Sequence, residues 1–248
     1  MKMIGKVMLV TSVALMLAFI LTRNKKIGTL AWFLFGVYWL ILAPFYYSIR
    51  DYYNSSVFTL AFIFFTYMAF KMQKARNLNV FIEVTSFSFL SCLIYFTVFF
   101  SFLKQELIEI VAEQTAAFVN LLGYNARNFG DLIELNSRYI KIILPCTGIE
   151  SMALFAGATL GIKADIKRKI AAFAVSVPVI YFLNILRNSF VLLSHAYMWF
   201  GENSFFYAHH VISKVLATLA LIGITLAVFK ALPELEKLII SLKDELIK

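Results

Sequence analysis

Seven apolar stretches, separated by more polar connections, dominate this chain and limit what it can fold into. A helix needs about 20 mostly apolar residues to cross the hydrocarbon layer of a membrane. The stretches cover residues 4–21, 28–47, 57–70, 80–103, 146–162, 170–195 and 211–229. We therefore predict an all-α polytopic membrane protein with about seven transmembrane helices, folded as a single integral membrane domain over residues 1–248.

The composition agrees with a membrane protein. Hydrophobic residues make up 61% of the chain, whereas soluble domains contain about 45–50%. Charged residues make up only 15%, against a soluble average of about 25%. The core of a soluble domain of this size does not need so many apolar residues, so the excess favours contact with lipid.

The reactive residue types are few, and this excludes several kinds of site. Two cysteines and three histidines cannot build a disulfide framework, a zinc ribbon or an iron–sulfur centre. The sequence has neither the HExxH spacing of zinc proteases nor a glycine-rich phosphate-binding loop. We therefore expect no metal and no cofactor. The net charge of +9 is attributed to membrane orientation, and no nucleic acid is expected as a partner.

Basic residues gather in alternate connections between the apolar stretches, which predicts the orientation. Three connections together hold ten basic residues and one acidic residue, Asp165. The basic residues are Arg23, Lys25, Lys26, Lys71, Lys74, Arg76, Lys163, Lys167, Arg168 and Lys169. The positive-inside rule places these three connections in the cytoplasm. We expect a cell-membrane protein with its N-terminus outside and its C-terminus in the cytoplasm.

The first stretch has an alternative interpretation as a signal peptide. Lys2 and Lys6 precede an apolar run, as in secretory signals. No A-x-A-like cleavage site follows, and the basic cluster at residues 23–26 resembles a stop signal. We favour a retained transmembrane helix.

Two segments have the pattern of amphipathic helices. Residues 104–122, within the extracytoplasmic segment 103–145, place apolar residues at helical spacing opposite a face with Glu106, Glu109 and Glu113. Residues 233–248 form a second such pattern in the cytoplasmic tail. Both helices are expected to lie on the membrane surface. Residues 131–144 alternate loosely and suggest a short hairpin.

Three chemistry-bearing residues, far apart in sequence, converge on one face of the predicted topology. Cys146 begins the fifth stretch at its outer end. Arg187 lies 18 residues after Lys169, about 27 Å along a helix that runs outward. His209 precedes the seventh stretch, which enters from outside. A thiol, a guanidinium and an imidazole at one level are what cysteine nucleophilic catalysis requires.

Each of these residues also has a purely structural interpretation. Cys146 could be a small buried hydrophobe, Arg187 could extend to the membrane interface, and His209 with His210 could be interfacial. Cys146, however, follows Pro145 at a helix start, where the helix dipole stabilises a thiolate. Supporting roles are considered for six neighbours of the three residues. These are Thr147, Gly148, Glu150, Asn184, His210 and Lys214.

Two of these neighbours have specific expected contacts. Asn184 lies one helical turn before Arg187 and could orient its guanidinium. Glu150 lies one turn after Cys146, where an unpaired carboxylate would oppose thiolate formation. We therefore expect Glu150 to pair with Arg187 or Lys214.

At these positions the sequence resembles the exosortase/archaeosortase family of membrane transpeptidases, and its archaeal branch more than the bacterial one. The resemblance covers residues 80–230 and rests on three motifs in order. They are Pro145-Cys146-Thr147-Gly148, Asn184-Ile185-Leu186-Arg187 and Ala208-His209-His210-Val211-Ile212-Ser213-Lys214. The resemblance implies that Cys146 is the nucleophile, Arg187 the second catalytic residue and His209 the third, with His210 as the alternative.

The resemblance also implies a substrate and a reaction. The substrates would be secreted proteins with a C-terminal signal made of a short motif, a hydrophobic helix and a basic tail. The enzyme would cleave at the motif through a Cys146 thioester and pass the new C-terminus to an amine acceptor, plausibly a membrane lipid. A membrane cysteine protease that uses water would need the same residues. A transporter would need ionisable residues across the membrane and often repeats, and a scaffold would not need Cys146.

Overall fold

The computed structural model describes residues 2–247 and divides the chain into two compact units. The first unit contains Met1–Leu90, Gly161–Lys163 and Glu234–Lys248. The second contains Ser91–Leu160 and Ala164–Pro233. The prediction of one integral membrane domain stays a prediction, and each unit is described by itself.

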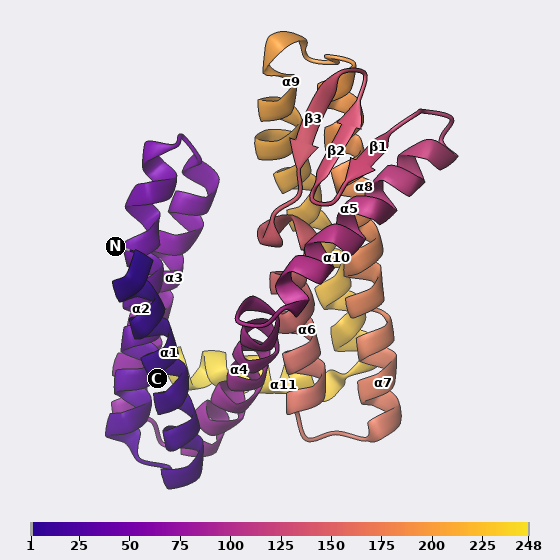
Figure 1. Cartoon of the computed structure of the whole chain (residues 1–248). Coiled ribbons are helices and arrows are strands. Elements are labelled where there is room, and N and C mark those ends of the chain that lie inside the picture. The colour runs from indigo at the N-terminus through magenta and orange to yellow at the C-terminus, as the bar shows by residue number, and fades with distance from the viewer. Residues whose placement is uncertain (1, 248) are drawn as a thin grey trace. The chain divides into compact units, whose positions relative to one another are not determined.

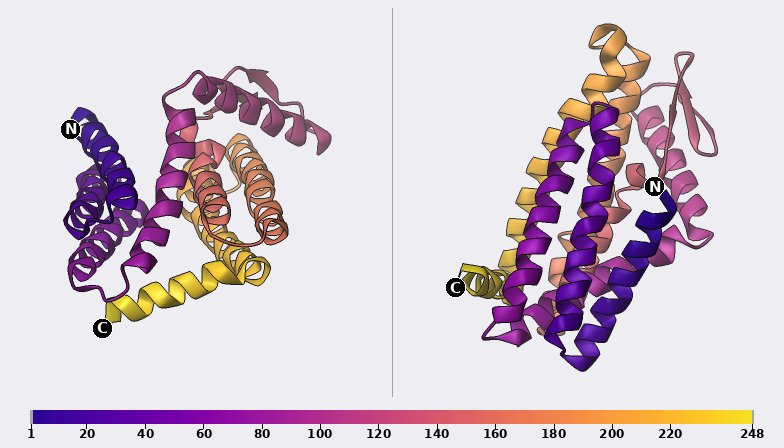
Figure 2. Two further views of the ribbon diagram at one scale, coloured as in Figure 1. Left: turned by 90° about the horizontal axis from the view of Figure 1, so that it is seen from below. Right: turned by 90° about the vertical axis from the view of Figure 1, so that its left-hand side faces the viewer.

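The first unit is built on three helices that lie side by side (Figure 2). They are α1 (Lys2–Thr22), α2 (Lys25–Ser48) and α3 (Tyr52–Lys74), followed by the first part of α4 (Leu78–Phe99). Trp32 of α2 is fully buried and stacks on Phe65 of α3 at 5.3 Å between ring centroids. Its indole Nε1 donates a hydrogen bond of 2.9 Å to Thr85 Oγ1 of α4, so a polar contact fixes the apolar packing.

The C-terminal tail forms the predicted amphipathic helix, α11 (Pro233–Ile247). Its apolar face is buried within the first unit, and Glu245 Oε2 accepts hydrogen bonds from the backbone N–H groups of Arg76 (3.1 Å) and Asn77 (3.4 Å). Tyr67 donates a hydrogen bond of 2.8 Å to the carbonyl of Leu246. The end of the tail is therefore fastened to the connection between α3 and α4.

The second unit contains the remaining helices and a small sheet (Figure 1). Its helical elements are the rest of α4, α5 (Leu103–Leu121), η1 (Leu144–Thr147), α6 (Ile149–Gly161), α7 (Ile166–Ala174), α8 (Val177–Ala196), η2 (Gly201–Asn203), α9 (Ser204–Phe206), η3 (Tyr207–Ile212) and α10 (Ser213–Ala231).

The chain is not wholly helical, because three antiparallel strands form a sheet between α5 and η1. The strands are β1 (Arg127–Phe129), β2 (Leu132–Leu135) and β3 (Arg138–Lys141), in the order β1-β2-β3. Asn136 and Ser137 join β2 to β3 with positive φ angles, which match the twist of a tight hairpin. The predicted hairpin is thus present, while β1 was not predicted.

The predicted amphipathic helix of this segment is also present, as α5. Its buried face includes Val111, Ala112 and Val119. This face packs against α8, η1 and the sheet, and Tyr181 of α8 donates a 2.7 Å hydrogen bond to Gln114. Protein therefore covers the face that the sequence pattern assigned to the membrane surface.

The apolar helices agree with a multi-pass membrane protein. Within the described residues, five are long and apolar enough to cross a membrane: Lys25–Ser48, Tyr52–Lys74, Leu78–Phe99, Ile166–Ala196 and Gly201–Ala231. Two shorter apolar helices cover Val7–Thr22 and Ile149–Gly161. All seven predicted stretches are helical for most of their length, although seven crossings stay a prediction.

Two of the predicted spans differ in detail from a continuous α-helix. The sixth is broken between α7 and α8, just before Pro178 in the first turn of α8. Proline has no N–H to donate and its ring clashes with the preceding turn, so it begins a helix more readily than it continues one. The seventh enters through the π-helix η3 before it becomes α10.

Candidate active site

Cys146 lies in the short 3₁₀ turn η1, directly before α6. Its N–H donates a hydrogen bond of 2.7 Å to the carbonyl of Ile143. Thr147 Oγ1 donates to the carbonyl of Leu144 (2.7 Å) and accepts from the N–H of Ile149 (3.3 Å). Gly148 then adopts a left-handed φ of 76°, which glycine reaches without steric cost. The segment holds Cys146 at the junction where α6 begins.

Two asparagines of α8 fix the backbone of Cys146. Asn184 and Asn188 donate side-chain hydrogen bonds of 2.6 and 2.9 Å to the Cys146 carbonyl. Residues four apart share one face of a helix, so both amides reach the same oxygen. Asn184 thus contacts the backbone of Cys146, whereas the sequence analysis expected it to orient Arg187. Asn188 was not singled out at all.

Arg187 lies on α8 between these asparagines and is half-buried. Its guanidinium interacts electrostatically with Cys146. Its Nη2 atom lies 3.5 Å from Nε2 of His209. Arg187 therefore links the cysteine segment to the segment that carries the histidines.

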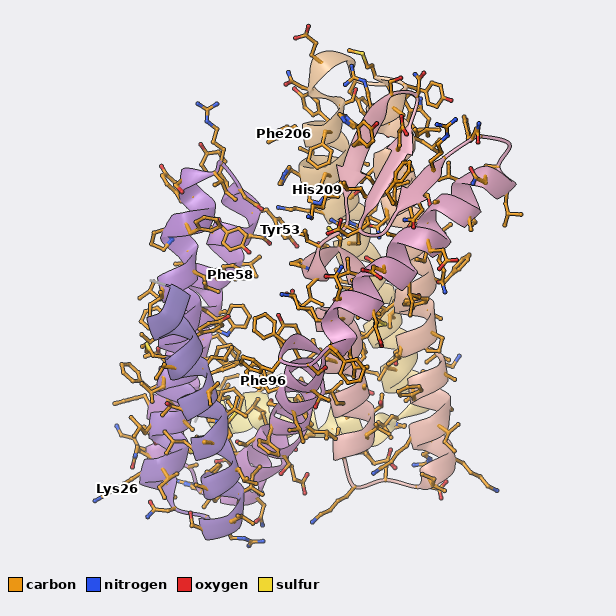
Figure 3. The ribbon with its side chains drawn as sticks, in the orientation of Figure 1. Lys26, Tyr53, Phe58, Phe96, Phe206 and His209 are labelled. Carbon is orange, nitrogen blue, oxygen red and sulfur yellow. The ribbon has the colours of Figure 1, made fainter. Side chains whose placement is uncertain are left out.

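The histidines lie in η3, a segment of π-helix. His209 is stacked on Phe205, with ring centroids 5.2 Å apart and an interplanar angle of 8°. His210 faces Phe206, the last residue of α9, at 5.5 Å between ring centroids, and Figure 3 labels His209 and Phe206. π-Helical turns interrupt α-helices frequently at functional sites. Of the two histidines, His209 is the one whose imidazole has a described contact with Arg187.

A cavity of about 470 Å³ adjoins these residues within the second unit. Arg187, Asn184 and Gly148 lie at its polar end, together with Glu150 and Ser213. The rest is lined mainly by apolar side chains of α8 and α10. Ser213 contributes to the lining, whereas its neighbour Lys214 does not.

Glu150 differs from its expected arrangement. It is an exposed residue that lines the cavity. Among the residues that the structure describes, its carboxylate makes no hydrogen bond and no ion pair, so the expected pairing with Arg187 or Lys214 is not formed. The carboxylate instead faces the open space beside the cysteine segment.

The arrangement combines a thiol, a fixed cation and an imidazole, and of the three residues Arg187 is the one that lines the cavity. A thiolate can attack a carbonyl, a guanidinium can stabilise the oxyanion that results, and an imidazole can transfer the protons. Within residues 2–247, no group of three or more histidine, cysteine or acidic residues is placed to hold a metal ion. The side chains of Cys146, Arg187 and His209 suit acyl transfer through a cysteine.

Comparison with known proteins adds independent information. Residues 3–228 match the family described as transmembrane exosortase (Exosortase_EpsH). The chain is 30% identical to archaeosortase A of Haloferax volcanii, over 86% of this chain and 82% of that protein. It is 27% identical to archaeosortase A of Natronomonas pharaonis, over 87% of this chain and 78% of that protein. No solved structure matches the chain.

Proposed function

Because the chain belongs to the transmembrane exosortase family, we propose that it is a membrane-embedded cysteine transpeptidase of the archaeosortase type. Its substrates are secreted proteins with a C-terminal signal made of a short motif, a hydrophobic helix and a basic tail. It cleaves at the motif and transfers the new C-terminus to an amine, with a membrane lipid as the acceptor.

One observation carries this proposal. Residues 146, 187 and 209 come from three separate elements, yet Arg187 interacts electrostatically with Cys146 and lies 3.5 Å from His209. An arginine in a membrane-spanning helix is costly, and this one is placed between a thiol and an imidazole. A purely interfacial arginine would not need either contact.

The first half of the reaction forms a thioester. The Cys146 thiolate attacks the carbonyl carbon of the scissile peptide bond, and Arg187 stabilises the oxyanion. The C–N bond then breaks, and protonated His209 gives its proton to the leaving amine.

The second half transfers the acyl group. The ammonium group of the acceptor loses one proton to neutral His209, and its nitrogen attacks the thioester carbonyl. The C–N bond of the new amide forms as the C–S bond breaks, and the departing sulfur takes the second proton of the nitrogen. Thioesters react readily with amines, which favours transfer over hydrolysis.

The orientation follows from the charge distribution of the connections. The connections near residues 23, 74 and 167 hold ten basic residues and one acidic residue. By the positive-inside rule, these connections lie in the cytoplasm. Cys146, Arg187 and His209 then lie at the extracytoplasmic face of the cell membrane, with the N-terminus outside and the C-terminus inside. The basic tail of a substrate would remain on the cytoplasmic side for the same reason.

The test is a comparison of the wild type with Cys146→Ala on a substrate that carries a C-terminal sorting tail. Mass spectrometry reads the new C-terminus, and an amide separates a transpeptidase from a protease, which leaves a carboxylate. We expect cleavage only with Cys146 and a trapped thioester in the wild type. Equal processing by Cys146→Ala would refute the proposal.

A further inference from the structure

The cavity beside Cys146 has a charged end and an apolar body. Glu150, Arg187 and Ser213 lie at the charged end. The body extends between α8 and α10, from Leu183 and Ile180 to Leu221 and Ile224. A ligand that fits both parts has a polar headgroup and a long apolar portion.

The volume limits what the apolar body can hold. One turn of an α-helix with its side chains fills about 400–600 Å³, given a diameter of about 10–12 Å and a pitch of about 5.4 Å. The cavity of about 470 Å³ is similar in size to one such turn, so it does not enclose a transmembrane helix, which has five or more turns. An extended peptide would bring unpaired backbone N–H and C=O groups into an apolar space. An alkyl chain brings no polar groups, and it fits.

The charge at the polar end limits the headgroup. Glu150 follows Cys146 by four residues, across the left-handed Gly148, and its carboxylate has no hydrogen-bond or ion-pair partner among the described residues. An unpaired carboxylate in a membrane-spanning segment is costly, and a cation from a ligand would neutralise it. Ser213 is a second polar group there. It is 2% exposed, and its hydroxyl has no hydrogen-bond partner within residues 2–247.

We propose that this cavity is the acceptor site, with the alkyl chain of an amine lipid between α8 and α10 and its ammonium group bound by Glu150. The inference rests on the proposed transpeptidase function and adds the residue that selects the amine. Glu150, at the start of α6, holds the ammonium group on the side of the cavity where the cysteine segment ends. His209 then takes the proton that the ammonium group loses before its nitrogen attacks.

The first experiment measures lipid binding without turnover. Purified Cys146→Ala protein is mixed in detergent with phosphatidylethanolamine or phosphatidylglycerol, and native mass spectrometry counts the bound lipid. We expect a preference for phosphatidylethanolamine that disappears when Glu150→Gln is added. Equal binding of both lipids before that change, or an unchanged preference after it, would overturn the role of Glu150.

The position of the alkyl chain is tested in the same assay. Ala217→Trp fills the apolar body of the cavity, and Ala227→Trp changes an exposed position on the same helix that does not line it. We expect the first variant to lose lipid binding and the second to retain it. Ala220→Leu, a smaller enlargement inside the cavity, replaces Ala217→Trp if that variant does not fold. Full binding by the cavity-filling variant contradicts the proposed chain site.

The second experiment follows the products in phosphatidylglycerol vesicles that contain a minor share of phosphatidylethanolamine. We expect Glu150→Gln to lower the ratio of lipid amide to free carboxylate about tenfold, the usual effect of losing a hydrogen bond between charged groups. Glu150→Asp restores part of the ratio, and Glu202→Gln, at an exposed position elsewhere, leaves it unchanged.

The two proposals fail in different ways. If the wild type forms no covalent intermediate at Cys146, the transpeptidase function fails, whatever the lipid-binding result. If the thioester forms and the ratio is the same in Glu150→Gln as in the wild type, only the acceptor site is wrong.

Discussion

At the scale of single residues, the carbonyl of Cys146 connects the proposed nucleophile to α8. Both Asn184 and Asn188 donate to it, at 2.6 and 2.9 Å, and both are buried. Loss of one such hydrogen bond typically costs about 0.5–1.5 kcal/mol. Because the carbonyl belongs to Cys146, the proposed nucleophile, we expect the loss also to let the thiol move relative to Arg187.

We therefore predict that Asn188→Ala lowers kcat/KM for cleavage about tenfold and reduces stability by about 1 kcal/mol. Asn184→Ala should do the same, and the double variant should lose more than either one. Cleavage rates and thermal unfolding measure the two effects. Asn128→Ala, at an exposed position on β1, is the control. Wild-type kinetics in the double variant would show that the two amides do not position Cys146.

A second prediction concerns the two adjacent histidines, His209 and His210. His209 Nε2 lies 3.5 Å from the Arg187 guanidinium, while His210 faces Phe206. Removal of a general acid–base group usually costs about 10²–10⁴ in rate. His209→Ala should lose activity in this range, and His210→Ala should lose less than about tenfold. Single-turnover cleavage by each variant provides the measurement, and a reversed order would assign the role to His210.

The sequence singles out Cys146, Arg187 and His209 as candidates because polar residue types are costly in a membrane, and because the charges of the connections predict that the three lie at one level. The sequence analysis did not single out Asn188, because the partner of its side chain is a backbone carbonyl and no sequence pattern reveals such a contact. The four-residue spacing from Asn184 was the available signal. The expected pairing of Glu150 was wrong because the sequence does not show where a cavity opens.

At the scale of elements, the turn from η1 into α6 depends on Gly148. Its φ is 76°, and a Cβ atom there would lie 3.2 Å from Cγ of Asn184. Gly130 has a similar φ of 67°, but a Cβ atom there would meet nothing within 4 Å. The two glycines share the backbone conformation and differ only in the surroundings of the added atom.

We predict that Gly148→Ala lowers stability by about 1–2 kcal/mol from the left-handed backbone alone, and by more because it displaces Asn184. Gly130→Ala should show only the backbone cost. Chemical unfolding of both variants gives the difference, which measures the contact with Asn184. Equal destabilisation would mean that Asn184 moves aside without cost.

The periodicity of apolar residues predicted most of the long helices but not their interruptions. The sixth stretch is interrupted between α7 and α8, just before Pro178. The π-helix η3 needs hydrogen bonds between residues five apart, and this register leaves no clear mark in the sequence. Both interruptions lie in the helices that carry Arg187 and His209.

At the scale of the whole chain, the contacts define two units, and apolar stretches alone could not predict this division. The sequence does not state which stretches pack together. The first unit gathers residues from both ends of the chain, because α11 returns to the connection between α3 and α4. The amphipathic pattern of the tail predicts a helix, but it does not predict that this helix packs against the connection between α3 and α4.

Glu245 is the residue that makes the return specific. It is buried, and its carboxylate accepts hydrogen bonds from the N–H groups of Arg76 and Asn77. We predict that Glu245→Ala destabilises the protein by about 1–3 kcal/mol, because two backbone N–H groups lose their charged acceptor. Glu236→Ala, at an exposed position of the same helix, should change stability little. Thermal unfolding compares the variants, and limited proteolysis should cut near residues 75–77 faster in Glu245→Ala. Equal melting and equal cleavage in both variants would mean that apolar packing of α11 alone joins the two ends of the chain.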